Sequence, residues 1–180
     1  MNFNEKCKIL SHEDSAPGYR TLVFSAPQIA AEVVPGQFVH VKVPRLDDAA
    51  LRRPFSVFDA DAEAGTLTVL YKIVGKGTEA LAKESVGSEV EVIGPLGFGF
   101  PVQCNGVPLL VGGGYGVAPL YFLAKRMLKT GVAEKPVLFV GGRTKDDLLA
   151  VDMFRHLGIE VHTATNDGSE GVKGFVTEPL

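Results

Sequence analysis

Residues 94–101 read GPLGFGFP, and they separate two sequence patterns whose difference decides the fold. Before this stretch, short runs rich in β-branched and aromatic residues are separated by turn residues. Several runs alternate, as in TLTVLY at residues 66–71, which is typical of strands with one buried face. The expected strands are residues 3–10, 19–25, 37–43, 54–58, 66–73 and 89–93. Six such runs predict a small antiparallel β-barrel, interrupted by one short helix at residues 78–83.

After residue 101 the pattern changes to alternating strands and helices. Strands are expected at residues 108–111, 137–140 and 159–164, and helices at 117–129 and 145–156. Residues 137–140 read VLFV, and a wholly apolar strand favours a parallel sheet with helices over both faces. The sequence therefore predicts two domains, a barrel over residues 1–100 and a parallel α/β domain over residues 101–180. Three strands are few for a doubly wound sheet, so we expect the second domain to be incomplete at its C-terminus.

Composition narrows the class of protein. The chain has 180 residues, 46% hydrophobic, and a formal net charge of -3, with a sequence pI near 5.8. This balance argues against a surface for nucleic acid or anionic lipid. Residues 106–124 carry no charge, but several glycines and two prolines in them favour a strand, a turn and a helix over a membrane span. No apolar secretory segment is visible at the N-terminus, so we expect a cytoplasmic protein.

Cysteines and histidines indicate neither a disulfide framework nor a metal site. Cys7 and Cys104 are far apart, and no second thiol lies near either one. The four histidines, His12, His40, His156 and His162, lack the spacing of metal ligands. We therefore expect small buried or partly buried thiols and surface or hydrogen-bonded histidines.

The first motif with a chemical meaning is RPFS at residues 53–56. Pro54 biases Arg53 toward an extended conformation, so a cation, a ring and a hydroxyl project from one strand at defined angles. Arg53 would pair with a pyrophosphate, Phe55 would supply an apolar face against a flavin, and Ser56 could hydrogen-bond a ring nitrogen. The same tetrapeptide could equally begin an ordinary strand with a surface arginine and a core phenylalanine.

A second motif follows in residues 70–78, which read LYKIVGKGT. Gly75 and Gly77 permit a close backbone approach, and Thr78 can cap the short helix and donate its hydroxyl and amide to phosphate. We expect a pyrophosphate between this turn and Arg53. Taken alone, the segment would be better explained as an ordinary glycine turn before a surface helix.

A third motif, VGGGYGVAP at residues 111–119, joins a strand to a helix. It departs from the usual dinucleotide fingerprint because Pro119 takes the place of the third glycine, although proline is tolerated in a first helical turn. Placed after a barrel with the first two motifs, this turn favours a nicotinamide nucleotide over a purely structural role. The contact residues would be Gly112, Gly113, Gly114 and Gly116. NADH and NADPH are not distinguished, since Arg143 could meet a 2′-phosphate or cap a strand end.

In this order, and across essentially the whole chain, these segments resemble the ferredoxin-reductase-like flavoproteins. With PGQF at residues 35–38, GPLGFGF at 94–100 and DGSEGVKG at 167–174, the chain looks most similar to the electron-transfer subunits of class 1B dihydroorotate dehydrogenases. The resemblance implies FAD on the barrel and NAD over the glycine turn of the α/β domain. It implies FAD contacts at Arg53, Pro54, Phe55, Ser56, Leu70, Tyr71, Lys72, Gly77 and Thr78.

The resemblance also implies a partner and a mechanism. In that family, the subunit exchanges electrons with an FMN-bearing dihydroorotate dehydrogenase subunit in a heterotetramer of pyrimidine biosynthesis. A [2Fe-2S] cluster held by four C-terminal cysteines connects the two, and this sequence contains neither those cysteines nor the family's Cys-Gly-Pro segment. Hydride would pass between nicotinamide and flavin without a catalytic side chain. Three alternatives stay open: a subunit of a ferredoxin:NADP oxidoreductase or sulfhydrogenase, a stand-alone NAD(P)H flavin reductase, and a binding module without flavin.

Overall fold

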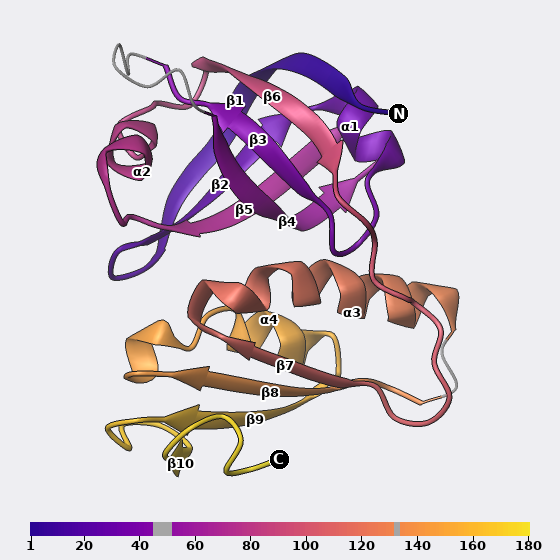
Figure 1. The fold of residues 1–180 in the computed structure, drawn as a ribbon, viewed down its shortest axis with the longest axis vertical. Coiled ribbons are helices and arrows are strands. Elements are labelled where there is room, and N and C mark those ends of the chain that lie inside the picture. Colours follow the sequence, from indigo (N-terminus) through magenta and orange to yellow (C-terminus); the bar gives the residue numbers. More distant parts are fainter. Residues whose placement is uncertain (45–51, 132–133) are drawn as a thin grey trace. The chain divides into compact units, whose positions relative to one another are not determined.

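A computed structural model describes residues 1–44, 52–131 and 134–180 of the chain (Figure 1). The chain divides into two compact units, Met1–Phe100 and Pro101–Leu180. The elements of the first unit are β1 Phe3–Ala16, β2 Tyr19–Ser25, α1 Pro27–Glu32, β3 Phe38–Lys42, β4 Arg53–Asp61, β5 Thr66–Lys72, α2 Lys76–Leu81 and β6 Glu89–Leu96.

The six strands of the first unit form a closed antiparallel barrel in the order β1-β2-β5-β4-β3-β6. This confirms the six-stranded barrel predicted from the sequence. Alternation along each strand sends one set of side chains inward, and Leu22, Phe24, Leu67 and Val69 are fully buried there. Because a closed barrel has no free edge, its strands are protected from pairing with other chains.

The barrel differs from the sequence prediction in several places. Strand β4 continues to Asp61 and β6 to Leu96, and α2 is Lys76–Leu81 where residues 78–83 were expected. Strand β1 continues to Ala16, well past residue 10, because its polar end still pairs with β2, as in the pair of Asp14 with Arg20. Helix α1, which has six residues, was not predicted. Pro27 stands in its first turn, and the buried Glu5 carboxylate accepts the backbone N–H of Ile29 at 3.0 Å.

The second unit contains a parallel sheet in the order β10-β9-β8-β7. Its two α-helices lie on the same side of the sheet (Figure 1), as right-handed crossovers in one direction require. On the other side, the Phe139 and His162 rings stack at 4.8 Å. The elements are β7 Leu109–Gly113, the 3-10 helix η1 Gly114–Val117, α3 Ala118–Thr130, β8 Val137–Gly142, the 3-10 helix η2 Lys145–Asp147, α4 Val151–His156, β9 Glu160–Thr165 and β10 Val172–Lys173.

The parallel sheet confirms the α/β prediction, with three corrections. A fourth strand, β10, was missed because two residues carry no recognisable pattern. The helix predicted over residues 145–156 is two pieces, because Ala150 adopts a left-handed conformation with φ 59° that a right-handed helix cannot continue. Within the described residues, both α-helices cover one face of the sheet, not both faces. No helix in the described ranges is long and apolar enough to cross a membrane.

Candidate cofactor site

Strand β4 divides the predicted RPFS motif into an outer and an inner pair. Pro54 and Ser56 are exposed, whereas Phe55 is only 7% exposed. Phe55 pairs with the core residue Val39 in β3, and Arg53 occupies the same side of the strand two residues earlier. A ligand on the outer surface of β4 would therefore meet Pro54 and Ser56 before the Phe55 ring. The sequence motif alone did not show which of its side chains point outward, because that depends on how β4 pairs with β3.

The predicted contacts on β5 show the same division. Tyr71 is buried, and its ring centroid lies 5.4 Å from that of Phe55, which joins the inner sides of β4 and β5. Lys72 is half-buried, and its Nζ donates to the Tyr19 hydroxyl at 2.8 Å while lying 4.4 Å from the Tyr19 ring centroid. Leu70 is 6% exposed.

The glycine turn after β5 is closed by Thr78. Its Oγ1 accepts the backbone N–H groups of Val74 at 2.9 Å and Gly75 at 3.2 Å, and donates to the Gly75 carbonyl at 3.0 Å. The Thr78 hydroxyl therefore shapes the turn. The first backbone N–H groups of a helix have no acceptor within it, so those at the start of α2 are suited to an anion.

The two barrel motifs meet at Gly77. A Cβ on this residue would overlap Nε of Arg53 and would lie 3.1 Å from Cζ and 3.2 Å from Cδ. The glycine therefore lets the start of α2 lie directly against the arginine side chain. The sequence prediction placed a pyrophosphate between these two groups, 24 positions apart, and the fold brings them into contact.

The neighbouring arginine has a different role. Arg52 donates to the Glu91 carboxylate at 2.8 Å and to the Glu91 carbonyl at 3.0 Å, and Lys42 donates to the same carboxylate at 3.3 Å. The hydrogen bonds from Arg52 and then Lys42 hold the pKa of Glu91 below its usual range. Arg52 thus ties β6 to the chain entering β4, and Arg53 is the guanidinium beside the turn.

In the second unit, the glycine-rich turn leads from β7 through η1 into α3. A Cβ on Gly112 would lie 3.1 Å from Leu120 Cδ1 and 3.2 Å from Val117 Cα, so the strand end packs closely on the helix start. Gly114 has a positive φ of 51°, and a Cβ on Gly116 would meet open space. Gly112 and Gly114 therefore shape the turn, and the open position at Gly116 leaves room for a ligand.

Comparison with known proteins identifies the family of this chain. Residues 6–99 match the family described as the oxidoreductase FAD-binding domain. A relative from Lysinibacillus sphaericus, the electron transfer subunit of dihydroorotate dehydrogenase B (NAD(+)), is 40% identical over 179 residues, which are 98% of this chain and 68% of that one. The chain belongs to this family of dihydroorotate dehydrogenase B electron transfer subunits. The resemblance stated from the sequence motifs is therefore confirmed.

Other members and neighbours of the family extend the comparison. The relative from Shouchella clausii is 46% identical over 149 residues, 81% of this chain and 56% of its own length. The chain thus spans between 56 and 68% of the length of these two relatives. Among solved structures, an NADH-dependent reduced ferredoxin-NADP oxidoreductase aligns with a TM-score of 0.86 at 32% identity, covering 97% of this chain and 62% of that one. An Amycolatopsis cytochrome P450 reductase aligns with a TM-score of 0.81 at 26% identity, covering 99% of this chain and 57% of that one.

The carboxyl ends of β8 and β9 add polar groups that the sequence analysis weighed only in part. Arg143 follows β8, and Asp147 Oδ2 lies 3.5 Å from its Nε and accepts its backbone N–H at 3.2 Å. After β9, Asp167 Oδ1 accepts both the hydroxyl and the backbone N–H of Ser169, and these bonds lower the pKa of Asp167. Ligands of parallel sheets bind at such ends, so both loops are candidates for contact with a nucleotide.

The residues of this chain do not fit the iron–sulfur cluster that the resemblance implied for the family. Such a cluster takes four cysteine ligands. The sequence has two. Cys7 is buried in the barrel as expected, whereas Cys104 of the second unit is exposed, so the expectation of a buried or partly buried thiol is wrong there. Burial, with a smaller contribution from Glu5, raises the pKa of Cys7 to about 12, so this thiol stays protonated. Within the described ranges, no three His, Cys, Asp or Glu side chains gather as metal ligands.

Proposed function

We propose that the barrel of this chain binds FAD and that the chain passes electrons between NAD and a dihydroorotate dehydrogenase catalytic subunit. The observation that carries the proposal is the contact of Arg53 with Gly77, which places a permanent cation against a glycine turn suited to phosphate. The family match over residues 6–99 supports the FAD assignment, and the names of the relatives support the electron acceptor and donor. A cytoplasmic location is part of the proposal.

We propose the following arrangement for FAD. Arg53 would bind the pyrophosphate beside the turn at Gly77 and Thr78. The exposed Pro54 would lie against the flavin, and the exposed Ser56 hydroxyl would hydrogen-bond a ring nitrogen. Leu70 and Lys72 of β5 would border the same surface, whereas Phe55 and Tyr71 would support it from within. When bound, FAD supplies a centre that exchanges a hydride with nicotinamide and electrons with a partner.

The glycine turn of the second unit would bind the nucleotide. Gly112, Gly113, Gly114 and Gly116 form the turn between β7 and α3, where a backbone without side chains lets a pyrophosphate approach. The ion pair of Arg143 with Asp147 favours NADH over NADPH, because a 2′-phosphate would have to displace or tolerate the Asp147 carboxylate.

The partner would be the FMN-bearing catalytic subunit, and the test is reconstitution. The chain is incubated with FAD and its bound FAD is measured. It is then mixed with a dihydroorotate dehydrogenase catalytic subunit from the same genome, and NAD reduction by dihydroorotate is followed at 1:1 stoichiometry. Arg53→Met is the test variant, and Arg155→Met, an exposed arginine paired with Asp152 in the second unit, is the matched control. The proposal predicts loss of FAD with Arg53→Met alone. Equal FAD content in both variants would contradict the assignment of the site.

A second candidate function is a flavoprotein subunit of a ferredoxin-NADP oxidoreductase. It is favoured by the TM-score of 0.86 and 32% identity to the structure of the NADH-dependent reduced ferredoxin-NADP oxidoreductase. The discriminating measurement is the partner that purifies with the tagged native protein. A dihydroorotate dehydrogenase catalytic subunit supports the first function, and a ferredoxin-dependent subunit supports the second.

A further inference from the structure

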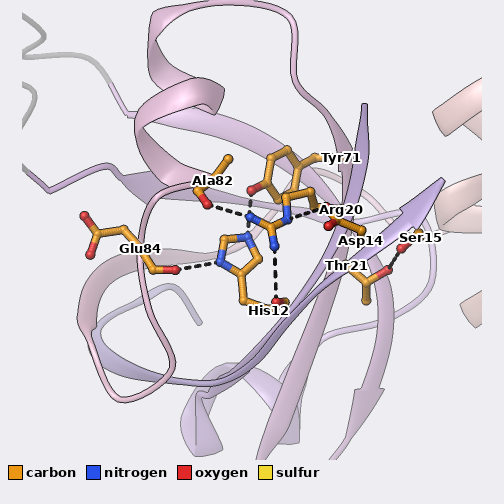
Figure 2. Close-up of polar contacts among 8 residues, drawn as sticks. All are labelled: His12, Asp14, Ser15, Arg20, Thr21, Tyr71, Ala82 and Glu84. Carbon is orange, nitrogen blue, oxygen red and sulfur yellow. Dashed lines mark hydrogen bonds and ion pairs between the residues drawn. The ribbon is translucent and has the colours of Figure 1, made fainter. Parts of the chain in front are cut away.

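A polar cluster joins β1, β2 and β5 to the residues that follow α2 (Figure 2). His12 of β1 lies between two partners. Its Nδ1 is 2.9 Å from the carbonyl oxygen of Glu84, and its Nε2 is 2.8 Å from the hydroxyl oxygen of Tyr71. His12 therefore connects the chain after α2 with a buried tyrosine of the barrel. The sequence analysis assigned no function to His12.

These partners fix the proton on the neutral His12 ring. A carbonyl oxygen can only accept a hydrogen bond, so Nδ1 carries the proton and donates a hydrogen bond to the Glu84 carbonyl. Nε2 is then an acceptor, and the Tyr71 hydroxyl donates to it. Burial raises the pKa of Tyr71 to about 12, so this hydroxyl keeps its proton throughout the neutral range.

Arg20 holds the same segment from the neighbouring strand. It lies opposite Asp14 on β1 and opposite Tyr71 on β5, so the three side chains share one face of the sheet. Its Nη1 donates to the Ala82 carbonyl at 2.6 Å, and its Nη2 donates to the His12 carbonyl at 3.4 Å. Its buried Nε is 3.1 Å from Asp14 Oδ1, an ion pair whose N–H is not aligned for a hydrogen bond.

Helix α2 depends on such external contacts. It has six residues, and a helix of that length is not stable without packing. At its start, Gly77 lies against Arg53, and beyond its end Ala82 and Glu84 are held by Arg20 and His12. The position of the glycine turn therefore follows from contacts at both ends of the helix.

We propose that His12 is a positioning residue for FAD binding, which holds residues 75–84 against the barrel through its bonds to Glu84 and Tyr71. The inference rests on the proposed function, because the same segment contains the turn at Gly77 that would bind phosphate. The apparent affinity for a ligand falls in proportion to the fraction of molecules in the competent conformation. A preformed turn thus raises the FAD affinity without any contact between His12 and the cofactor.

Protonation of His12 should weaken its contact with Tyr71, whereas the hydrogen bond from Nδ1 to the Glu84 carbonyl would be kept. The ring nitrogens contact the Glu84 carbonyl and the Tyr71 hydroxyl, and the charges of Arg20, Asp14 and the Glu84 carboxyl act on the ring from a greater distance. A protonated ring would direct a second N–H at the Tyr71 hydroxyl and place a second cation near Arg20. Burial is the main cause that lowers the pKa of His12 from its ordinary 6.5, so this change belongs to acid conditions.

The test uses hydrogen exchange on the flavin-free chain and FAD titration of the same samples. The reporting amides are those of Glu79 and Ala82, which donate to the carbonyls of Gly75 and Thr78 at 2.9 Å in each case. His12→Asn is the test variant. His156→Asn is the matched control, because His156 Nδ1 also contacts a main-chain carbonyl, that of Asp152 at 2.6 Å, but in the second unit.

His12→Asn should speed hydrogen exchange at both amides by about tenfold and weaken FAD binding by about tenfold. This factor is expected when about one molecule in ten keeps α2 in the conformation that binds FAD. His156→Asn should change neither. Tyr71→Phe is the milder second variant, since it removes one hydroxyl and keeps the ring on Phe55, and it should weaken FAD binding by about threefold. Wild-type FAD affinity should also fall between pH 7 and pH 5, and this fall should be smaller with His12→Asn.

The outcomes separate the inference from the function on which it rests. Unchanged exchange at Glu79 and Ala82 with His12→Asn would refute the positioning role. Faster exchange with unchanged FAD affinity would also refute it, because helix position would not limit binding. If the wild-type chain takes up no FAD while ADP also fails to bind, the proposed function fails. The exchange data would then still decide whether His12 holds α2.

Discussion

Replacement of Gly77 by alanine probes the contact that joins the two barrel motifs. Alanine favours a helix by about 1 kcal/mol over glycine, so α2 by itself would be stabilised. The new Cβ, however, would overlap Nε of Arg53 and lie 3.1 Å from Cζ. Overpacking of this kind costs about 1–3 kcal/mol where the surroundings cannot move. An arginine side chain can move, so we expect the clash to displace the Arg53 guanidinium instead of unfolding the barrel.

The effect of Gly77→Ala should therefore appear mainly as weaker FAD binding. Charge-assisted hydrogen bonds contribute about 1.5–3 kcal/mol, and each 1.4 kcal/mol is tenfold in affinity. Gly77→Ala should weaken FAD binding by about 10- to 100-fold while the free energy of unfolding changes by less than about 1 kcal/mol. The assay is equilibrium titration with FAD, followed by quenching of flavin fluorescence, beside urea denaturation of the flavin-free chain.

A double-variant cycle sharpens this prediction. If the alanine acts by displacing Arg53, then Gly77→Ala should add little to the loss already caused by Arg53→Met. Gly116→Ala is the matched control, because a Cβ at that position of the second unit meets nothing within 4 Å. Wild-type FAD affinity in Gly77→Ala, or full additivity with Arg53→Met, would refute the reasoning.

Three further predictions concern pH, a turn and nucleotide choice. The pKa of His12 in the folded chain lies below its ordinary 6.5. The contribution of His12 to stability is therefore complete above pH 6.5 and is lost as the pH falls through the folded-state pKa. In urea titrations, the difference in unfolding free energy between wild type and His12→Asn should shrink from pH 7.5 to pH 5.5. Gly171→Ala should destabilise the second unit by more than about 2 kcal/mol, measured by thermal denaturation, since φ is +69° and a Cβ would overlap the Thr163 carbonyl; an unchanged melting temperature would contradict this. Asp147→Asn should raise NADPH affinity relative to NADH by about tenfold in flavin-reduction assays, because it removes the carboxylate beside Arg143; a constant ratio would show that these residues do not contact the ribose.

The sequence predicted the features that have a strong local pattern. Alternation along residues 66–71 placed β5, and the change after residues 94–101 separated the barrel from the parallel sheet. The meeting of Arg53 with Gly77 was expected from chemistry, since both groups suit one pyrophosphate, and the fold brings them into contact. These predictions rest on short-range rules of strands, turns and charge.

Features set by long-range contacts were not predictable. The inward direction of Phe55 depends on its pairing with Val39 in another strand. His12 looked like an ordinary histidine, because its partners Tyr71 and Glu84 lie 59 and 72 positions away in the sequence. Strand β10 has only two residues, too few to produce a pattern, and helix α1 was missed although α2, of the same length, was predicted. The register shift in β1 between Ile9 and Ser11 also breaks the alternation, so the strand pattern alone would have placed His12 on the outer face.

The most direct test of FAD on the barrel is the visible absorbance spectrum of the purified chain after incubation with FAD and removal of excess, followed by mass analysis of what denaturation releases. We predict flavin bands and one equivalent of released FAD for the wild type, and their loss in Arg53→Met. A folded, colourless wild-type chain that refuses added FAD, or one that keeps FAD equally well without Arg53, would contradict the assignment of this site.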